Sequence, residues 1–145
     1  MRFNPDNAIV KLCARGMELE GQGSKEEAKQ LFYQAWDEAA TPFEKFTAAH
    51  YVARHQPTAA DKLAWDEKCL RIALTIDDET MKATYPSLYL NIAKCYEDLN
   101  DMQQAGKNYS LASSYATFLA NDGYGNMIRS GIEKGLARVK AAAEN

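Results

Sequence analysis

The stretch Tyr89–Ala112 reads YLNIAKCYEDLNDMQQAGKNYSLA, and it decides the fold that we expect for the chain. Apolar and small residues recur in it at the three- and four-residue spacing of helices, and Asn100 and Asp101 interrupt that pattern as a turn would. Small side chains at Ala93 and Ala105 let two antiparallel helices approach closely, while the aromatic side chains around them fill the gaps. The stretch therefore predicts one helical hairpin.

The same order of residue kinds occurs earlier in the chain at one constant offset. Six positions of the earlier segment align without a gap on six positions of the stretch: Leu12, Gly16, Leu19, Ala28, Phe32 and Ala35 on Tyr89, Ala93, Tyr96, Ala105, Tyr109 and Ala112. The chance periodicity of a generic helical hairpin would rarely reproduce this agreement. The two segments are therefore interpreted as copies of one repeat.

This repeat resembles the tetratricopeptide repeat, in which a large residue, an apolar-small pair and an aromatic occupy the first helix and small, aromatic and small residues the second. The resemblance is to a small, bacterial-type, stand-alone domain of that family. It implies an all-α, right-handed α-solenoid in a single domain, 1–145, that folds as one cooperative unit. We expect hairpins at about 5–39, 42–76 and 85–119 and a capping helix at about 124–142.

Local signals predict where these helices begin. Ser24 and Thr41 are each followed three residues later by glutamate, which is the signature of a capping box. The expected starts are Asn4–Asp6, Ser24 with Glu27, Thr41 with Pro42 and Glu44, Thr58 with Asp61, and Pro86. We expect the second helix of the last hairpin to continue through Leu119.

The middle hairpin departs from the family pattern. The offset between the two good repeats exceeds two periods of about 34 residues, so roughly nine extra residues lie between them. We expect part of this excess near Pro57 and part in the connection 77–85. Trp65 and Asp66 stand where the second helix of this hairpin should place a small residue.

The last expected helix is amphipathic, as a capping helix needs to be. Its apolar stripe consists of Ile128, Ile132, Leu136 and Val139. Gly131 and Gly135 lie one turn apart on this helix. Close packing against the preceding hairpin explains them better than a dimer contact does.

Composition bounds the class of protein. The chain has 145 residues, 46% of them hydrophobic, and a net charge of −3, so a nucleic-acid backbone would meet no overall attraction. No apolar run approaches the roughly 20 residues that span a bilayer, and the first residues lack the apolar core of a signal peptide. We expect a cytoplasmic protein that binds neither nucleic acid nor membrane.

Patterns for covalent chemistry are missing from the sequence. His50 and His55 are five residues apart, about 140° round a helix, so they cannot chelate one metal as a pair spaced by four could. The three cysteines have no metal-ligand spacing, and we expect reduced, mostly buried thiols. No Gly-rich phosphate loop or nucleophile elbow appears. We expect no catalysis, no cofactor and no metal.

The resemblance implies that a peptide or helix of a partner binds in a concave groove lined by the first helix of each hairpin. The residues expected on that face are Met17, Phe46, His50, Arg54, Leu90, Asn91, Lys94 and Asp98, with Cys13, Glu20, Ala53 and Glu97 beside them. The donors among them, His50, Arg54, Asn91 and Lys94, could hold a carboxylate or a peptide backbone. A solvated helix face and a hydrogen-bonded structural histidine are the alternatives. Cys13, Phe46 and Leu90 are apolar where chaperone-binding members of the family carry lysine and asparagine, which argues against that clamp.

The expected function is that of a non-catalytic adaptor, acting as a monomer or weak homodimer. A self-associating scaffold is the first alternative, with a dimer patch among Tyr89, Tyr115, Phe118 and Tyr124. An enzyme subunit with an unrecognised site is the second.

Overall fold

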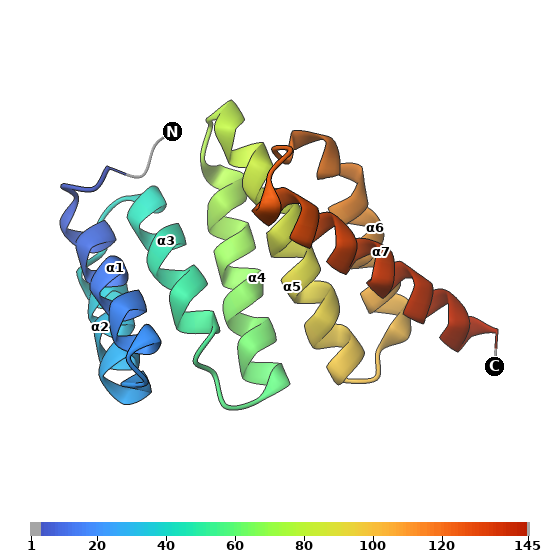
Figure 1. Cartoon of the computed structure of the whole chain (residues 1–145), viewed down its shortest axis with the longest axis horizontal. Coiled ribbons are helices and arrows are strands. Elements are labelled where there is room, and N and C mark those ends of the chain that lie inside the picture. Colours follow the sequence, from blue (N-terminus) through green and yellow to red (C-terminus); the bar gives the residue numbers. More distant parts are fainter. Residues whose placement is uncertain (1–3, 145) are drawn as a thin grey trace. The chain divides into compact units, whose positions relative to one another are not determined.

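The computed structural model describes residues 4–144, and this part of the chain is all-α, as expected: it contains helices and no strand (Figure 1). The α-helices are α1 (Ala8–Gly21), α2 (Lys25–Glu38), α3 (Pro42–Ala53), α4 (Ala59–Thr75), α5 (Tyr85–Asp98), α6 (Met102–Ser114) and α7 (Gly123–Ala143), and the two 3₁₀ helices are η1 (Glu79–Thr84) and η2 (Ala116–Phe118). The helices form two compact units, one up to Asp77 and one from Asp78 on. No helix between residues 4 and 144 is long and apolar enough to cross a membrane.

The first unit consists of two helical hairpins, α1 with α2 and α3 with α4, and α3 also contacts both helices of the first hairpin. The centre of the first hairpin explains the repeat pattern. A methyl group added at Gly16 would lie 2.4 Å from a ring carbon of Phe32, and that ring is fully buried. A small residue on α1 is therefore what lets the aromatic of α2 fill the space between the helices.

The caps of the first unit agree with the sequence at α3 and α4 and differ from it at α1 and α2. Thr41 and Glu44 form the expected capping box, and the Thr58 side chain accepts from the backbone N–H of Asp61. The α1 cap is Asn7, outside the expected Asn4–Asp6, and the Ser24 side chain makes no capping hydrogen bond. The Ser24 N–H donates to the carbonyl of Leu19 (2.8 Å), so this residue closes the end of α1 instead.

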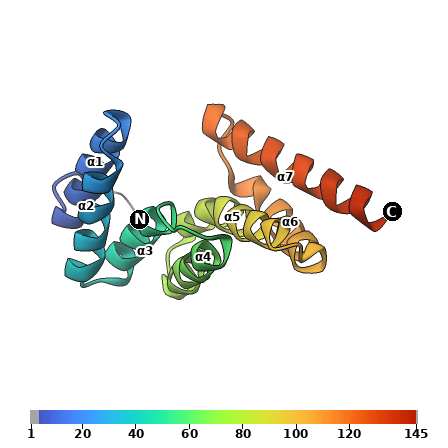
Figure 2. The same cartoon turned by 90° about the horizontal axis from the view of Figure 1, so that it is seen from below.

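The second unit consists of η1, the hairpin α5 with α6, η2 and α7, and α7 contacts both helices of the hairpin (Figure 2). The glycines of α7 lie at this contact. A methyl group at Gly131 would lie 3.2 Å from Leu90 of α5, and one at Gly135 would lie 2.2 Å from the ring of Tyr109 on α6. The expected packing of these glycines against the preceding hairpin is confirmed.

Two segments of the second unit differ from the expected pattern. The connection 77–85, where part of the extra length was expected, holds the 3₁₀ helix η1, capped by the Asp78 side chain. The α6 helix ends at Ser114, short of the expected Leu119, and η2 follows. Tyr115, at the break, packs its ring against Tyr85 (5.2 Å between centroids) and Tyr89 (5.9 Å). The α6 helix therefore ends at the point where the Tyr115 ring packs against two aromatic rings of α5.

Candidate functional site

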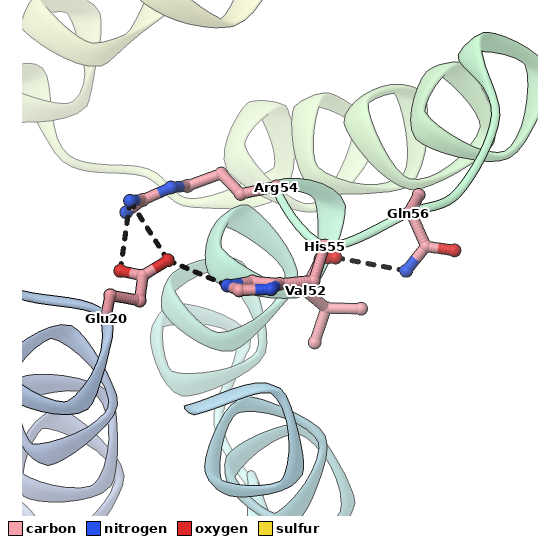
Figure 3. A network of polar contacts seen from close by, with 5 residues as sticks. All are labelled: Glu20, Val52, Arg54, His55 and Gln56. Atoms are coloured by element: carbon pink, nitrogen blue, oxygen red, sulfur yellow. Dashed lines mark hydrogen bonds and ion pairs between the residues drawn. The ribbon is translucent and has the colours of Figure 1, made fainter. Parts of the chain in front are cut away.

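The polar contacts of the first unit centre on Glu20, in the last turn of α1 (Figure 3). Its carboxylate accepts two hydrogen bonds from Nη2 of Arg54, at 3.0 and 3.2 Å, and lies 2.7 Å from Nε2 of His55. Arg54 caps α3 and His55 follows it. The carboxylate thus ties the end of α1 to the end of α3 with charge-assisted hydrogen bonds.

The chain after α3 is held by Gln56. Its side-chain amide donates to the backbone carbonyl of Val52 at 3.0 Å (Figure 3) and to the hydroxyl of Tyr33 on α2 at 2.8 Å. These bonds fix the backbone that carries Arg54 and His55.

The aromatic ring of Tyr51 packs beside the Arg54 side chain. Its ring stacks on Phe32 (5.0 Å between centroids, 14° between planes), and the Arg54 guanidinium lies 5.5 Å from its centroid. The His50 ring meets Tyr51 edge-on at 5.2 Å. His50 and Arg54, two of the predicted donors, therefore meet at one aromatic ring.

The predicted site residues of the first unit differ in accessibility. Met17 is 42% exposed and the Arg54 side chain 45%, so both can reach a partner. Phe46 is only 5% exposed, beside the Phe43 ring (6.3 Å), and offers little surface. His50 is partly buried, and burial, followed by the nearby Arg54 charge, lowers the pKa of its imidazole below the usual value.

Arg54 keeps donors for a ligand. Only its Nη2 is hydrogen-bonded to Glu20, and no described residue accepts from its Nε or Nη1. A guanidinium has five N–H groups in a rigid fork suited to carboxylates and carbonyls. The side chain is thus held in place by Glu20 and Tyr51 while part of its fork stays available.

The predicted residues of the second unit lie on α5 in two environments. Leu90 is 4% exposed because α7 covers it at Gly131, and Asn91 is half-buried. Lys94 and Asp98 are exposed and line a polar hollow of about 320 Å³ together with Glu97 and Arg138. Only the end of α5 therefore presents predicted site residues to solvent.

The floor of this hollow is an ion-pair cluster between α5, α6 and α7. Arg138 donates to both carboxylate oxygens of Glu97, at 2.9 and 3.0 Å, and to the Tyr109 hydroxyl at 3.2 Å, while that hydroxyl donates to Glu97. The Arg138 bonds lower the pKa of Glu97, and burial with the Glu97 bond raises the pKa of Tyr109 to about 12. The cluster fastens α7 to the hairpin.

Sequence reasoning placed Glu20 and Glu97 on these faces but missed both ion pairs. Glu20 and Arg54 are 34 residues apart, and their ion pair depends on how α1 packs against α3. Nothing in the sequence indicated Arg138, since its contact with α5 depends on how α7 packs. His55 and Tyr51 were missed in the same way.

The three cysteines are buried, and burial raises the pKa of the Cys13 thiol to about 11 and that of Cys69 still further. Within residues 4–144 no group of three His, Cys, Asp or Glu side chains is placed to hold a metal ion.

Comparison with known proteins gave no match: no protein-family model fits the chain, and neither the curated proteins nor the solved structures contain a significant relative.

Proposed function

We propose that the chain is a non-catalytic adaptor that binds a segment of a partner protein on the surface formed by α1 and α3. The observation that carries this proposal is Arg54, a half-exposed guanidinium that Glu20 and Tyr51 hold in place while its Nε and Nη1 remain without an acceptor. Because the side chain is already ordered, binding costs less conformational entropy.

The surface around Arg54 suits a peptide with both polar and apolar groups. The free donors of Arg54 would bind a carboxylate or a backbone carbonyl of the partner, and the exposed Met17 would give an adaptable apolar contact. The proposal includes tetratricopeptide-like stacking of the hairpins as a right-handed solenoid, and a cytoplasmic location. The repeat register from Leu12 to Ala112 supports the stacking.

A self-associating scaffold is the second candidate. It is favoured by exposed apolar side chains close together in sequence in the second unit, Phe118 (44%), Tyr124 (55%) and Met127 (60%). Light scattering on the purified chain separates the candidates. A molar mass equal to that of the monomer at every protein concentration would exclude the self-associating scaffold.

The adaptor proposal is tested by capturing partners from the native cell with the wild-type chain and two matched variants. Arg54→Met removes the donors but keeps the length of the side chain, and Arg15→Met removes another exposed arginine, which pairs with Glu18 on α1. We expect Arg54→Met to lose about tenfold of the captured partner, since a charge-assisted hydrogen bond contributes about 1.5–3 kcal/mol. Arg15→Met should capture it as the wild type does.

Both variants are first compared by thermal melting, so that only folded protein is scored. Equal capture by Arg54→Met and the wild type would refute the assignment of this surface.

A further inference from the structure

Two lysines of the first unit lie against one tryptophan ring. The Lys45 ammonium is 4.6 Å from the centroid of Trp36, and the Lys68 ammonium is 5.3 Å from that centroid and 4.3 Å from the centroid of Trp65. The two indoles meet edge to face at 5.1 Å. The aromatic pair thus holds the two cations in place, which lowers the entropy that they would lose on binding a ligand.

These cations lack anionic partners. No carboxylate of residues 4–144 forms an ion pair with Lys45, Lys68 or the neighbouring Arg71, whereas Lys62 on the same helix is paired with Asp66 at 2.7 Å. Unpaired like charges repel one another, and an anion between them would relieve that repulsion. This accumulation of positive charge occurs in a chain whose net charge is −3.

A hollow of about 340 Å³ adjoins the cations. Its lining residues are Ala40, Pro42, Lys45, Arg71, Ile72 and Thr75. Lys45 belongs both to the hollow and to the tryptophan contact, so the two features form one continuous surface. We define the basic-aromatic patch as Trp36, Lys45, Trp65, Lys68 and Arg71.

We propose that the basic-aromatic patch is a second interaction surface, which binds an acidic peptide segment of a partner protein. Carboxylates of the segment bind Lys45, Lys68 and Arg71, and an apolar side chain of the segment enters the hollow beside Ile72. The surface is distinct from the one assigned to Arg54, because Lys45 and Arg54 are nine residues apart and so lie on opposite sides of α3.

Charge and size favour a short peptide over a long polyanion. The patch has three unpaired cations and a hollow that fits a side chain, whereas Asp37 and Glu38, both exposed next to Trp36, would repel an extended chain of phosphates. The test must still distinguish an acidic peptide from a nucleic acid, because both are anionic.

The two tryptophans of the chain are both in the patch, so intrinsic fluorescence reports on it directly. The probe is a fluorescein-labelled peptide of glutamates with interspersed leucines, and its counterpart with glutamine at every glutamate is the negative control. Peptide anisotropy is measured with the labelled probe, and tryptophan emission with the unlabelled one. We expect the acidic peptide to bind, to change the tryptophan emission and to be weakened by added salt, and its counterpart not to bind.

The double variant Lys45→Gln/Lys68→Gln should bind the acidic peptide at least about tenfold more weakly. The matched control Lys11→Gln/Lys25→Gln removes two exposed charges elsewhere in the same unit and should bind within about twofold of the wild type. Arg71→Gln alters an exposed residue and should weaken binding severalfold without changing the melting temperature, so the test holds even if the double variant unfolds.

Three outcomes would overturn the proposal. In the first, the wild type leaves the tryptophan emission unchanged, or Arg71→Gln and the double variant bind the peptide as the wild type does. In the second, a labelled oligonucleotide binds more tightly than the peptide and is lost in the double variant, which would make the occupant a nucleic acid. In the third, the peptide does not bind, and light scattering shows that the wild type self-associates whereas the double variant does not. The occupant of the patch would then be a second copy of the chain.

Discussion

Gly16 shows how one missing methyl group sets the distance between two helices. The buried ring of Phe32 occupies the place where a side chain at Gly16 would lie, so α1 and α2 can approach closely. The equivalent position of the last hairpin holds Ala93, which is fully buried, as is Tyr109 of the same hairpin. Both hairpins therefore place a small residue at this position of their first helix.

Gly16→Ala should lower the free energy of unfolding by about 1–3 kcal/mol, because the added methyl group overpacks a ring that has nowhere to move. Gly21→Ala is the matched control, since a methyl group there meets nothing within 4 Å. It should be neutral or stabilise α1 by up to about 1 kcal/mol. Urea denaturation of both variants measures the difference, and equal stabilities would mean that the helices are not as close as described.

His50 should make stability depend on pH. Its pKa is lowered in the folded chain, chiefly by burial and then by the Arg54 and Lys62 charges, against an opposing effect of Asp66. The imidazole of His50 therefore binds a proton more readily in the unfolded chain than in the folded chain. The contribution of neutral His50 to the free energy of unfolding is complete above about pH 6.5, the ordinary pKa of histidine. It is lost as the pH falls through the lower pKa of His50 in the folded chain.

We therefore expect the melting temperature to fall as the pH is lowered from about 7 to about 5. His50→Gln should show a shallower fall over this range. Glu44 and Glu97, whose pKa values are also lowered, lose their contributions only at more acidic pH, so they do not obscure it. Identical slopes for wild type and His50→Gln would contradict the stated cause.

Sequence reasoning at this scale predicted which residues fill space better than it predicted which of the expected site residues are accessible. Gly16, Phe32, Ala93 and Tyr109 follow from helical spacing and size alone. By contrast Phe46 was expected on an accessible face but is buried, because the accessibility of a position depends on which neighbours cover it.

At the scale of elements, the hairpins were predictable and their ends less so. Thr41 and Ser24 carry the same capping signature, yet only Thr41 uses it. Glu44 accepts from the N–H groups of Ala40 and Thr41 and from the Asn7 side chain, so its contacts reach beyond its own helix. Ser24 instead ends the tight turn from α1, and that turn sets its backbone conformation.

Thr41→Ala should cost about 1 kcal/mol of unfolding free energy, the usual effect of removing an N-cap. Ser24→Ala should change it by no more than about 0.5 kcal/mol, since no capping bond is lost. Chemical denaturation of the two variants provides the comparison. A large loss for Ser24→Ala would show that its hydroxyl does cap α2.

The contacts of α7 explain why part of the candidate site could not be foreseen. Its amphipathic stripe predicted a covering helix, but not that Leu90 would lie beneath Gly131 or that Arg138 would reach Glu97. Such contacts depend on the rotation and crossing of a helix against its neighbours, which local sequence does not specify.

At the scale of the whole molecule, the recurring offset between Leu12 and Tyr89 remains the strongest indication of repeats. It predicted the hairpin pattern that both units show, and the extra length that contains η1. In the first unit, the ion pair between Glu20 and Arg54 joins α1 to the end of α3. A partner that binds the proposed surface of α1 and α3 would contact both helices.

Site-specific photocrosslinking in the native cell tests the assigned surface most directly. A photoreactive amino acid at Met17 should crosslink to the partner, whereas the same residue at Leu99, in the turn between α5 and α6, should not, although the two positions are equally exposed (42% and 43%). A partner crosslinked from Met17, and lost in the background of Arg54→Met, is the predicted result. Crosslinking from Leu99 alone, or equally from both positions, would contradict the binding surface on α1 and α3.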